Sequence, residues 1–196
     1  YPSRRAHCHQ IIRMCEGFSN IGLLVELWLP ISILALRKKE KLLNEINHIY
    51  DLGSNLSFSF VPVLPYSDQN NNNLLFKVLK FIIYRANSWL FAFLCLLKLR
   101  FRRYKQNEFI YTRHLPLVWL LRKSISFGLL RLQRKLAVEI HDVVPNYALK
   151  CLDAANLVIT ISKSLEKLLL MDIKTKKSNV ITLPDGIRAK FLKEAI

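Results

Sequence analysis

Short apolar runs alternate with segments of helical periodicity along the 196-residue chain. The apolar runs predict strands at residues 23–29, 57–64, 108–112, 136–141, 157–161 and 179–183. Apolar positions at helical spacing predict helices at residues 4–18, 34–50, 74–104, 115–132, 147–155, 162–171 and 189–196. Strands that alternate with helices are typical of βαβ units. The pattern therefore predicts an α/β fold, a Rossmann-like parallel sheet with helices on both faces.

Composition narrows the possible classes of protein. The chain is 52% hydrophobic, which is enough to build a core and excludes a disordered protein. Its few glycines permit neither a G-x-x-x-x-G-K-[ST] phosphate loop nor a G-x-G-x-x-G dinucleotide fingerprint. Lys and Arg number 30 against 14 Asp and Glu, a net charge of +16. This surplus is larger than solubility requires and indicates an anionic partner.

Cysteine spacing and apolar segment length bear on the cellular compartment. No C-x-x-C pair is present among Cys8, Cys15, Cys95 and Cys151, so they predict reduced, mostly buried thiols in a cytosolic protein. The most apolar stretch, residues 86–97, ends at Lys98. It is shorter than the about 18 residues of a membrane span, so we expect no integral membrane protein.

Four motifs occur in order in the second half of the chain. They are IYTRH at residues 110–114, VEIHDVVP at 138–145, LDAANLVITISKSLEKLLL at 152–170, and NVITLPDGI at 179–187, followed by Phe191. In this order they resemble the N-terminal half of a family-four glycosyltransferase of GT-B fold. The resemblance is strongest over residues 108–191 and weak over 31–105. One departure is Asp185-Gly186, where Asn-Gly is commoner in the family.

The resemblance implies a domain organisation. Residues 1–187 would be the acceptor-side, N-terminal domain, and residues 188–196 the start of a linker to a C-terminal domain that binds the nucleotide. The family's first strand, central in the sheet, would precede Tyr1, so the chain is expected to be a fragment truncated at both ends. The family retains the anomeric configuration and needs neither a metal nor another cofactor. The fragment alone is therefore expected to be inactive.

His141 is the candidate catalytic residue, since it follows a predicted parallel strand at the end where ligands bind in open α/β sheets. In the family the matching histidine contacts the donor sugar; the alternative is a structural histidine. Asp142 either orients His141 or caps the next turn. Arg113, also after a strand, either binds a phosphate or acceptor hydroxyl or is a solvated loop charge.

Further candidates for substrate binding come from helix starts. Ser162 is a natural N-cap of the helix that follows it. A lesser role is to line the cleft between the two domains that the resemblance implies. At the start of the first helix, basic and polar side chains favour an anion such as a phosphate, the alternative being ordinary surface charge. These residues are Arg4, Arg5, His7 and Gln10.

Basic clusters follow the apolar stretch and suit an anionic bilayer surface. The alternative is a buried crossover helix with a basic end. The candidate membrane-contact residues are Trp89, Phe91, Lys98, Arg100, Arg102 and Arg103. No RRM, KH or zinc-finger signature is present, so nucleic acid is not the expected partner.

The expected function is transfer of a sugar from a nucleotide diphosphate-sugar to a glycan or lipid-linked hydroxyl acceptor, with retention. We expect it at the cytoplasmic, inner face of a membrane, in polysaccharide or cell-envelope synthesis. The alternative is a non-catalytic basic α/β module that binds an anionic membrane or nucleic acid. The donor sugar and the acceptor cannot be named from these residues.

Overall fold

The computed structural model describes residues 6–50, 56–65, 74–103, 108–129, 135–172 and 179–183. The chain divides into two compact units, Tyr1–Leu94 and Cys95–Ile196. One long helix, α3 (Leu74–Phe101), contains the boundary between them. Each unit is described by itself below.

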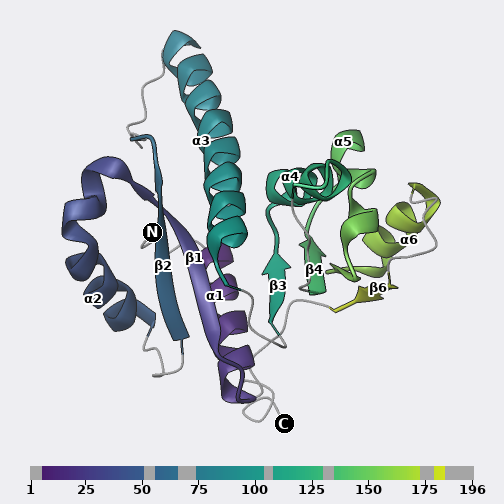
Figure 1. Ribbon diagram of the computed structural model, residues 1–196, viewed down its shortest axis with the longest axis horizontal. Coiled ribbons are helices and arrows are strands. Elements are labelled where there is room, and N and C mark those ends of the chain that lie inside the picture. Colours follow the sequence, from purple (N-terminus) through teal and green to yellow (C-terminus); the bar gives the residue numbers. More distant parts are fainter. Residues whose placement is uncertain are drawn as a thin grey trace. The chain divides into compact units, whose positions relative to one another are not determined.

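The first unit contains two parallel strands and their helices (Figure 1). In chain order these are α1 (Ala6–Asn20), β1 (Val25–Ser32), the short 3-10 helix η1 (Ile33–Lys38), α2 (Lys39–Tyr50), β2 (Leu56–Val63) and the first part of α3. Gly22 has φ of 88° and donates its N–H to the carbonyl of Ser19. This left-handed conformation ends α1 and turns the chain into β1.

Apolar side chains from both strands form the core of this unit. The register places Leu27 beside Phe58 and Leu29 beside Phe60. Every second residue of a strand points to the same face, so these four side chains share one face of the strand pair. They pack with Ile12 of α1 and with Leu42 and Ile46 of α2. This apolar cluster packs α1 and α2 against the strand pair.

The second unit is a four-stranded, all-parallel sheet with strand order β3-β4-β5-β6. Its elements are β3 (Phe109–Thr112), α4 (Leu115–Ser126), β4 (Lys135–Ile140), α5 (Asn146–Leu149), η2 (Leu152–Ala154), β5 (Leu157–Thr160), α6 (Lys163–Asp172) and β6 (Asn179–Thr182). Strands adjacent in sequence are adjacent in the sheet, and a helix joins each to the next. All four strands therefore end at the same edge.

The predicted α/β class with parallel strands is confirmed, and the structure is consistent with a Rossmann-like arrangement. The predicted strands lie within a few residues of the observed ones. One difference is that the described strands form two sheets, where the sequence predicted one. Cys15, Cys95 and Cys151 are buried, as predicted, and none of these three is in a disulfide.

Two helix predictions were wrong in their extent. The helix predicted at 115–132 ends at Ser126, because Gly128 has φ of 67° and its N–H binds the carbonyl of Ile125. The helix predicted at 147–155 is instead the short α5 followed by η2. The helix predicted at 189–196, the 188–196 linker and Asp185-Gly186 lie outside the described residues.

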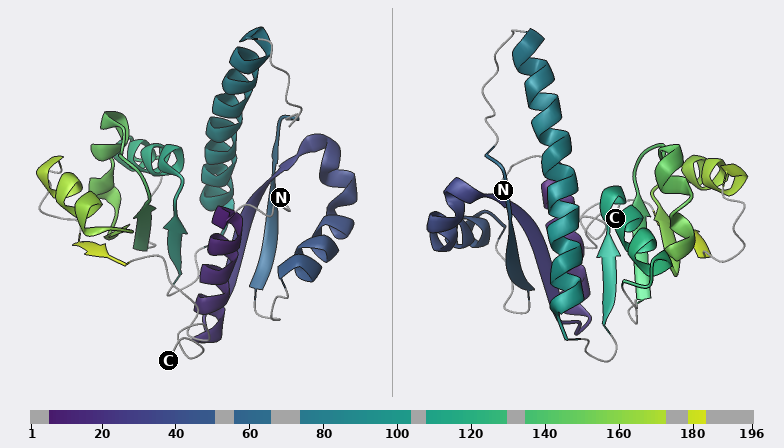
Figure 2. Two further views of the ribbon diagram at one scale, coloured as in Figure 1. Left: turned by 180° about the vertical axis from the view of Figure 1, so that it is seen from behind. Right: turned by 45° about the horizontal axis from the view of Figure 1, so that its top comes forward.

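Helix α3 is longer than its most apolar stretch. It runs without a break for 28 residues, and of the described helices it alone is long and apolar enough to cross a membrane, with 17% of its apolar window buried. By length and composition the whole helix, unlike residues 86–97 alone, could therefore cross a membrane. Figure 2 shows the N-terminal end of α3 extending past β1 and β2 of the same unit.

Candidate functional site

Three polar residues meet at the carboxyl-terminal edge of the four-stranded sheet. Arg113 directly follows β3, Glu139 is the penultimate residue of β4, and His141 directly follows β4. The parallel register pairs Thr112 with Val138, so the next residues along each strand, Arg113 and Glu139, are neighbours. His141 is two residues after Glu139 and therefore on the same side of the strand. Register and alternation alone bring the three side chains together.

Glu139 is the centre of this cluster. Its Oε2 accepts a hydrogen bond of 2.9 Å from Nε of Arg113, and its Oε1 lies 2.7 Å from Nη2 of the same guanidinium. Oε1 also binds Nε2 of His141. One carboxylate thus holds an arginine through a two-point contact and a histidine ring through one nitrogen.

Burial makes this arrangement electrostatically demanding. The side chain of Glu139 is only 6% exposed, against 19% for Arg113 and 29% for His141. A buried carboxylate is tolerated when a positive partner and hydrogen bonds replace its water. Arg113 supplies the positive charge, and an ionised carboxylate can only accept, so Nε2 of His141 is the donor. Glu139 consequently fixes both the tautomer and the orientation of the ring.

Arg113 and His141, which were predicted separately, are joined in the structure through Glu139. Two N–H groups of Arg113 are used on Glu139, so the arginine serves to hold the carboxylate in its ionised state. The arrangement is that of a histidine oriented by a carboxylate, which is suited to hydrogen bonding and proton exchange with a hydroxyl group.

A second polar cluster lies at the same edge, between β5, β6 and α6. The hydroxyl groups of Thr160 and Thr182 are 3.0 Å apart, and Thr182 donates a 2.5 Å hydrogen bond to Glu166. Nζ of Lys163 lies 3.1 Å from the same carboxylate. The hydrogen bonds from Thr182 and Lys163 lower the pKa of Glu166. These contacts fasten the start of α6 to the ends of two strands.

Asp142 and Ser162 act as local caps. Oδ1 of Asp142 accepts a 2.7 Å hydrogen bond from the N–H of Val143, which stabilises the turn after β4. Oγ of Ser162 accepts a 3.2 Å bond from the N–H of Leu165, so Ser162 is the N-cap of α6. Both side chains are exposed at the edge of the sheet where His141 lies.

The predicted anion site at the start of the chain is described only in part. Arg4 and Arg5 lie outside the described residues, and His7 belongs to α1 with a side chain outside them. Gln10 lies in α1 and is half-buried.

The predicted membrane-contact residues differ from one another in exposure. Trp89, Phe91 and Lys98 are half-buried, whereas Arg100 and Arg103 are exposed. Arg102 forms an ion pair of 3.3 Å with Glu108. The two aromatic side chains therefore offer less surface than the sequence predicted.

Sequence reasoning missed Glu139 and, in the second cluster, Thr160, Lys163, Glu166 and Thr182. Glu139 was part of the VEIHDVVP motif but received no role. The available signal was a carboxylate inside an otherwise apolar run, since a charged residue within a buried parallel strand needs a partner. Among the described residues, no group of three or more His, Cys, Asp or Glu side chains comes together as a metal site would require.

Comparison of the chain with protein-family models, with curated proteins and with solved structures gives no match. The resemblance to family-four glycosyltransferases therefore stays a prediction, and function has to be argued from the site itself.

The pairing of Arg113 with Glu139 should appear as a coupling energy. We expect Glu139→Met and Arg113→Met each to destabilise the second unit by about 3 kcal/mol, because each leaves a mostly buried charge without its partner. The double variant should lose clearly less than the sum of the two. Hydrogen exchange of the β3 and β4 amides measures these changes; additive losses would contradict the pairing.

His114 should make the second unit sensitive to acid. Burial lowers the pKa of His114 to about 4 from an ordinary value of 6.5. The unfolded chain then binds the proton more readily, so stability is full above pH 6.5 and falls by about 3 kcal/mol as the pH drops towards 4. His114→Asn, which keeps a good residue at the start of α4, should flatten this slope.

The matched control for His114 is the exposed His48→Gln in α2. Hydrogen exchange of the β3–β6 amides between pH 7 and 4 follows the change, after correction for the intrinsic exchange rate. An unchanged slope in His114→Asn would show that another group is responsible.

Proposed function

We propose that the chain is the acceptor-side, N-terminal domain of a retaining glycosyltransferase of GT-B fold. The observation that carries the proposal is the Arg113–Glu139–His141 cluster at the carboxyl-terminal edge of a parallel sheet. Open α/β sheets bind their ligands at this edge. The position of His141 after its strand is also the one that the resemblance predicts for a sugar-contacting histidine.

In the proposed reaction, the bond between the anomeric carbon of the donor sugar and its diphosphate oxygen breaks. A new bond forms from that carbon to the oxygen of the acceptor hydroxyl, on the same face of the ring. The hydroxyl proton passes to the leaving diphosphate. His141 would hydrogen-bond a hydroxyl of the donor sugar, with its ring held by Glu139. Fixing the ring before substrate arrives avoids reorganisation during the reaction.

Arg113 and Glu139 would be positioning residues in this scheme. Arg113 keeps Glu139 ionised, and Glu139 fixes the imidazole of His141. Asp142 and Ser162, both exposed beside the cluster, are the proposed lining of the cleft, and Arg4, Arg5, His7 and Gln10 the proposed binding residues for an anionic group.

The proposed domain organisation follows the resemblance. The resemblance places a further strand at the centre of the sheet, before Tyr1. The nucleotide would bind in a C-terminal domain beyond residue 187. No metal or other cofactor is part of the proposed mechanism.

The proposed setting is the cytoplasmic, inner face of a membrane, with a glycan or a lipid-linked molecule as acceptor. The net charge of +16 supports an anionic surface as partner.

In the full-length protein, His141→Ala should reduce kcat at least about 100-fold, because a group that contacts the reacting sugar is lost. Glu139→Gln should reduce kcat about tenfold with little change in KM, since the ring remains but is less firmly oriented. The exposed Lys150→Ala is the control. Steady-state transfer from a nucleotide-sugar measures the effects, and circular dichroism checks folding. Near wild-type activity of His141→Ala would overturn its catalytic role.

Residues 1–196 alone should transfer no sugar, because the proposed nucleotide-binding domain is not among them. A panel of radiolabelled nucleotide-sugars, with and without simple glycan acceptors, tests this. The full-length protein, assayed in parallel, is the positive control. Turnover by the 196 residues would show that the donor site is contained in these residues and that the proposed division is wrong.

A further inference from the structure

The N-terminal half of α3 presents apolar side chains to solvent. Six large apolar residues in its first nine positions are 50–79% exposed: Leu74, Leu75, Val78, Leu79, Phe81 and Ile82. We call these six residues the α3 stripe. A soluble protein rarely exposes so continuous an apolar surface without a partner for it.

The stripe is continuous because of its spacing. At 100° per residue, the six positions cover an arc of about 160° on one side of the helix. Asn87, on the opposite side, fastens α3 to the end of β2. Its Oδ1 accepts a 2.9 Å bond from the N–H of Leu64, and its Nδ2 donates a 3.1 Å bond to the carbonyl of Leu64. The stripe therefore faces away from the strands of its own unit.

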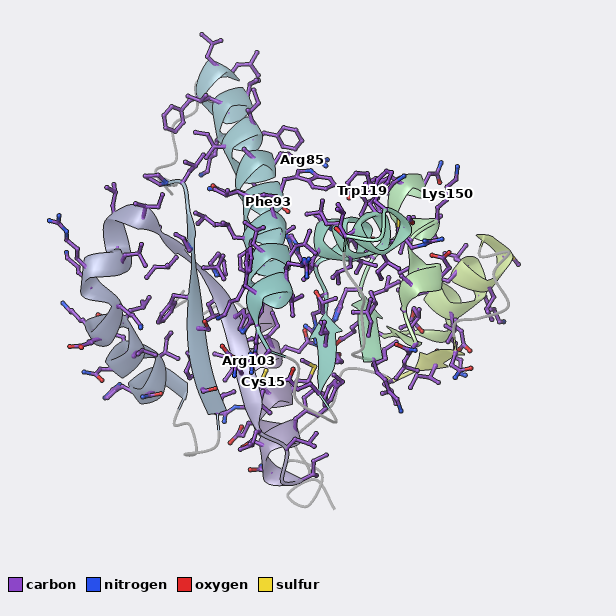
Figure 3. The ribbon with its side chains drawn as sticks, viewed as in Figure 1. Cys15, Arg85, Phe93, Arg103, Trp119 and Lys150 are labelled. Atoms are coloured by element: carbon purple, nitrogen blue, oxygen red, sulfur yellow. The ribbon has the colours of Figure 1, made fainter. Side chains whose placement is uncertain are left out.

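The charged residues of α3 and the two residues after it all have one sign. Residues 74–103 contain no Asp or Glu, and their charged residues are Lys77, Lys80, Arg85, Lys98, Arg100, Arg102 and Arg103. The guanidinium of Arg85 lies 5.1 Å from the ring of Phe81, at the end of the stripe. Figure 3 shows Arg85 pointing outward from α3. Apolar side chains bordered by basic groups that can reach phosphates are complementary to an anionic bilayer surface.

We propose that the N-terminal half of α3 inserts the α3 stripe into an anionic lipid bilayer, with Lys77 and Arg85 at the phosphates. This moves the membrane contact from Trp89 and Phe91, which are half-buried, to the preceding three turns of the helix. The inference extends the membrane partner proposed above by naming the segment that enters the lipid. It does not depend on glycosyl transfer.

Sedimentation with vesicles tests the proposal. The 196-residue chain is mixed with vesicles of phosphatidylcholine alone or with about 30 mol % phosphatidylglycerol, the anionic component. We expect binding to the anionic vesicles. The triple variant Leu75→Gln, Leu79→Gln, Ile82→Gln should bind at least about tenfold more weakly. It has less apolar surface to bury in the lipid when the helix inserts.

A matched control makes the same chemical change at other exposed apolar positions. Leu24, Leu34 and Met171 are 74–92% exposed, and Leu24→Gln, Leu34→Gln, Met171→Gln should bind as wild type. Insertion itself is measured with Phe81→Trp, whose fluorescence should be quenched by brominated lipid. Phe127→Trp, at an exposed position in the second unit, should show no quenching beyond that of the native tryptophans.

Three results would overturn the proposal. One is binding of the stripe variant equal to that of wild type, which would indicate a purely electrostatic contact. The second is no binding to either vesicle. The third is a concentration-dependent dimer, in light scattering, that the stripe variant abolishes and vesicles do not disperse. If any of these occurs while the full-length protein still transfers sugar to a soluble acceptor, only the membrane inference is wrong.

Discussion

The ion pair between Arg113 and Glu139 determines most of what the second unit can do. A carboxylate this deeply buried is stable as an ion only while the two-point contact with Arg113 is made. That contact requires β3 and β4 to keep their register, because a shift of one residue would turn one of the two side chains to the other face. The orientation of His141 depends in turn on the same carboxylate. Strand register, buried charge and the candidate catalytic ring are therefore one linked arrangement.

The sequence predicted the strands well because buried parallel strands are nearly continuous apolar runs. The runs VELWL and LVIT, for example, predict strands from their apolar residues alone. Helix ends were predicted less well, since a glycine such as Gly128 ends a helix through its backbone conformation while the apolar pattern continues beyond it. The division into two sheets was not predictable from such local patterns, because strand pairing is a long-range choice.

The sequence indicated where the candidate site residues lie along the chain, but not which of them are in contact. Arg113 and His141 were found because each follows a strand. Their link through Glu139 depends on which strands are neighbours and in what register, and no local pattern contains that information. The partial burial of Trp89 and Phe91, two of the predicted membrane-contact residues, was not predictable for a related reason. In a helix that is apolar nearly all round, the exposed face is decided by where the helix is fastened, and here Asn87 decides it.

The two halves of α3 differ sharply in how far their side chains are buried. The later half buries Ala92, Cys95 and Leu99, at the spacing of one helical face. The earlier half buries none of its residues, yet the helix continues through it. Stability in water comes mostly from packing an apolar face, so an extension with no fully buried side chain adds little to folding. Its apolar surface would instead favour aggregation unless another medium covers it. Since residues 74–103 contain basic residues and no Asp or Glu, an anionic bilayer is the medium that fits both the surface and the charge.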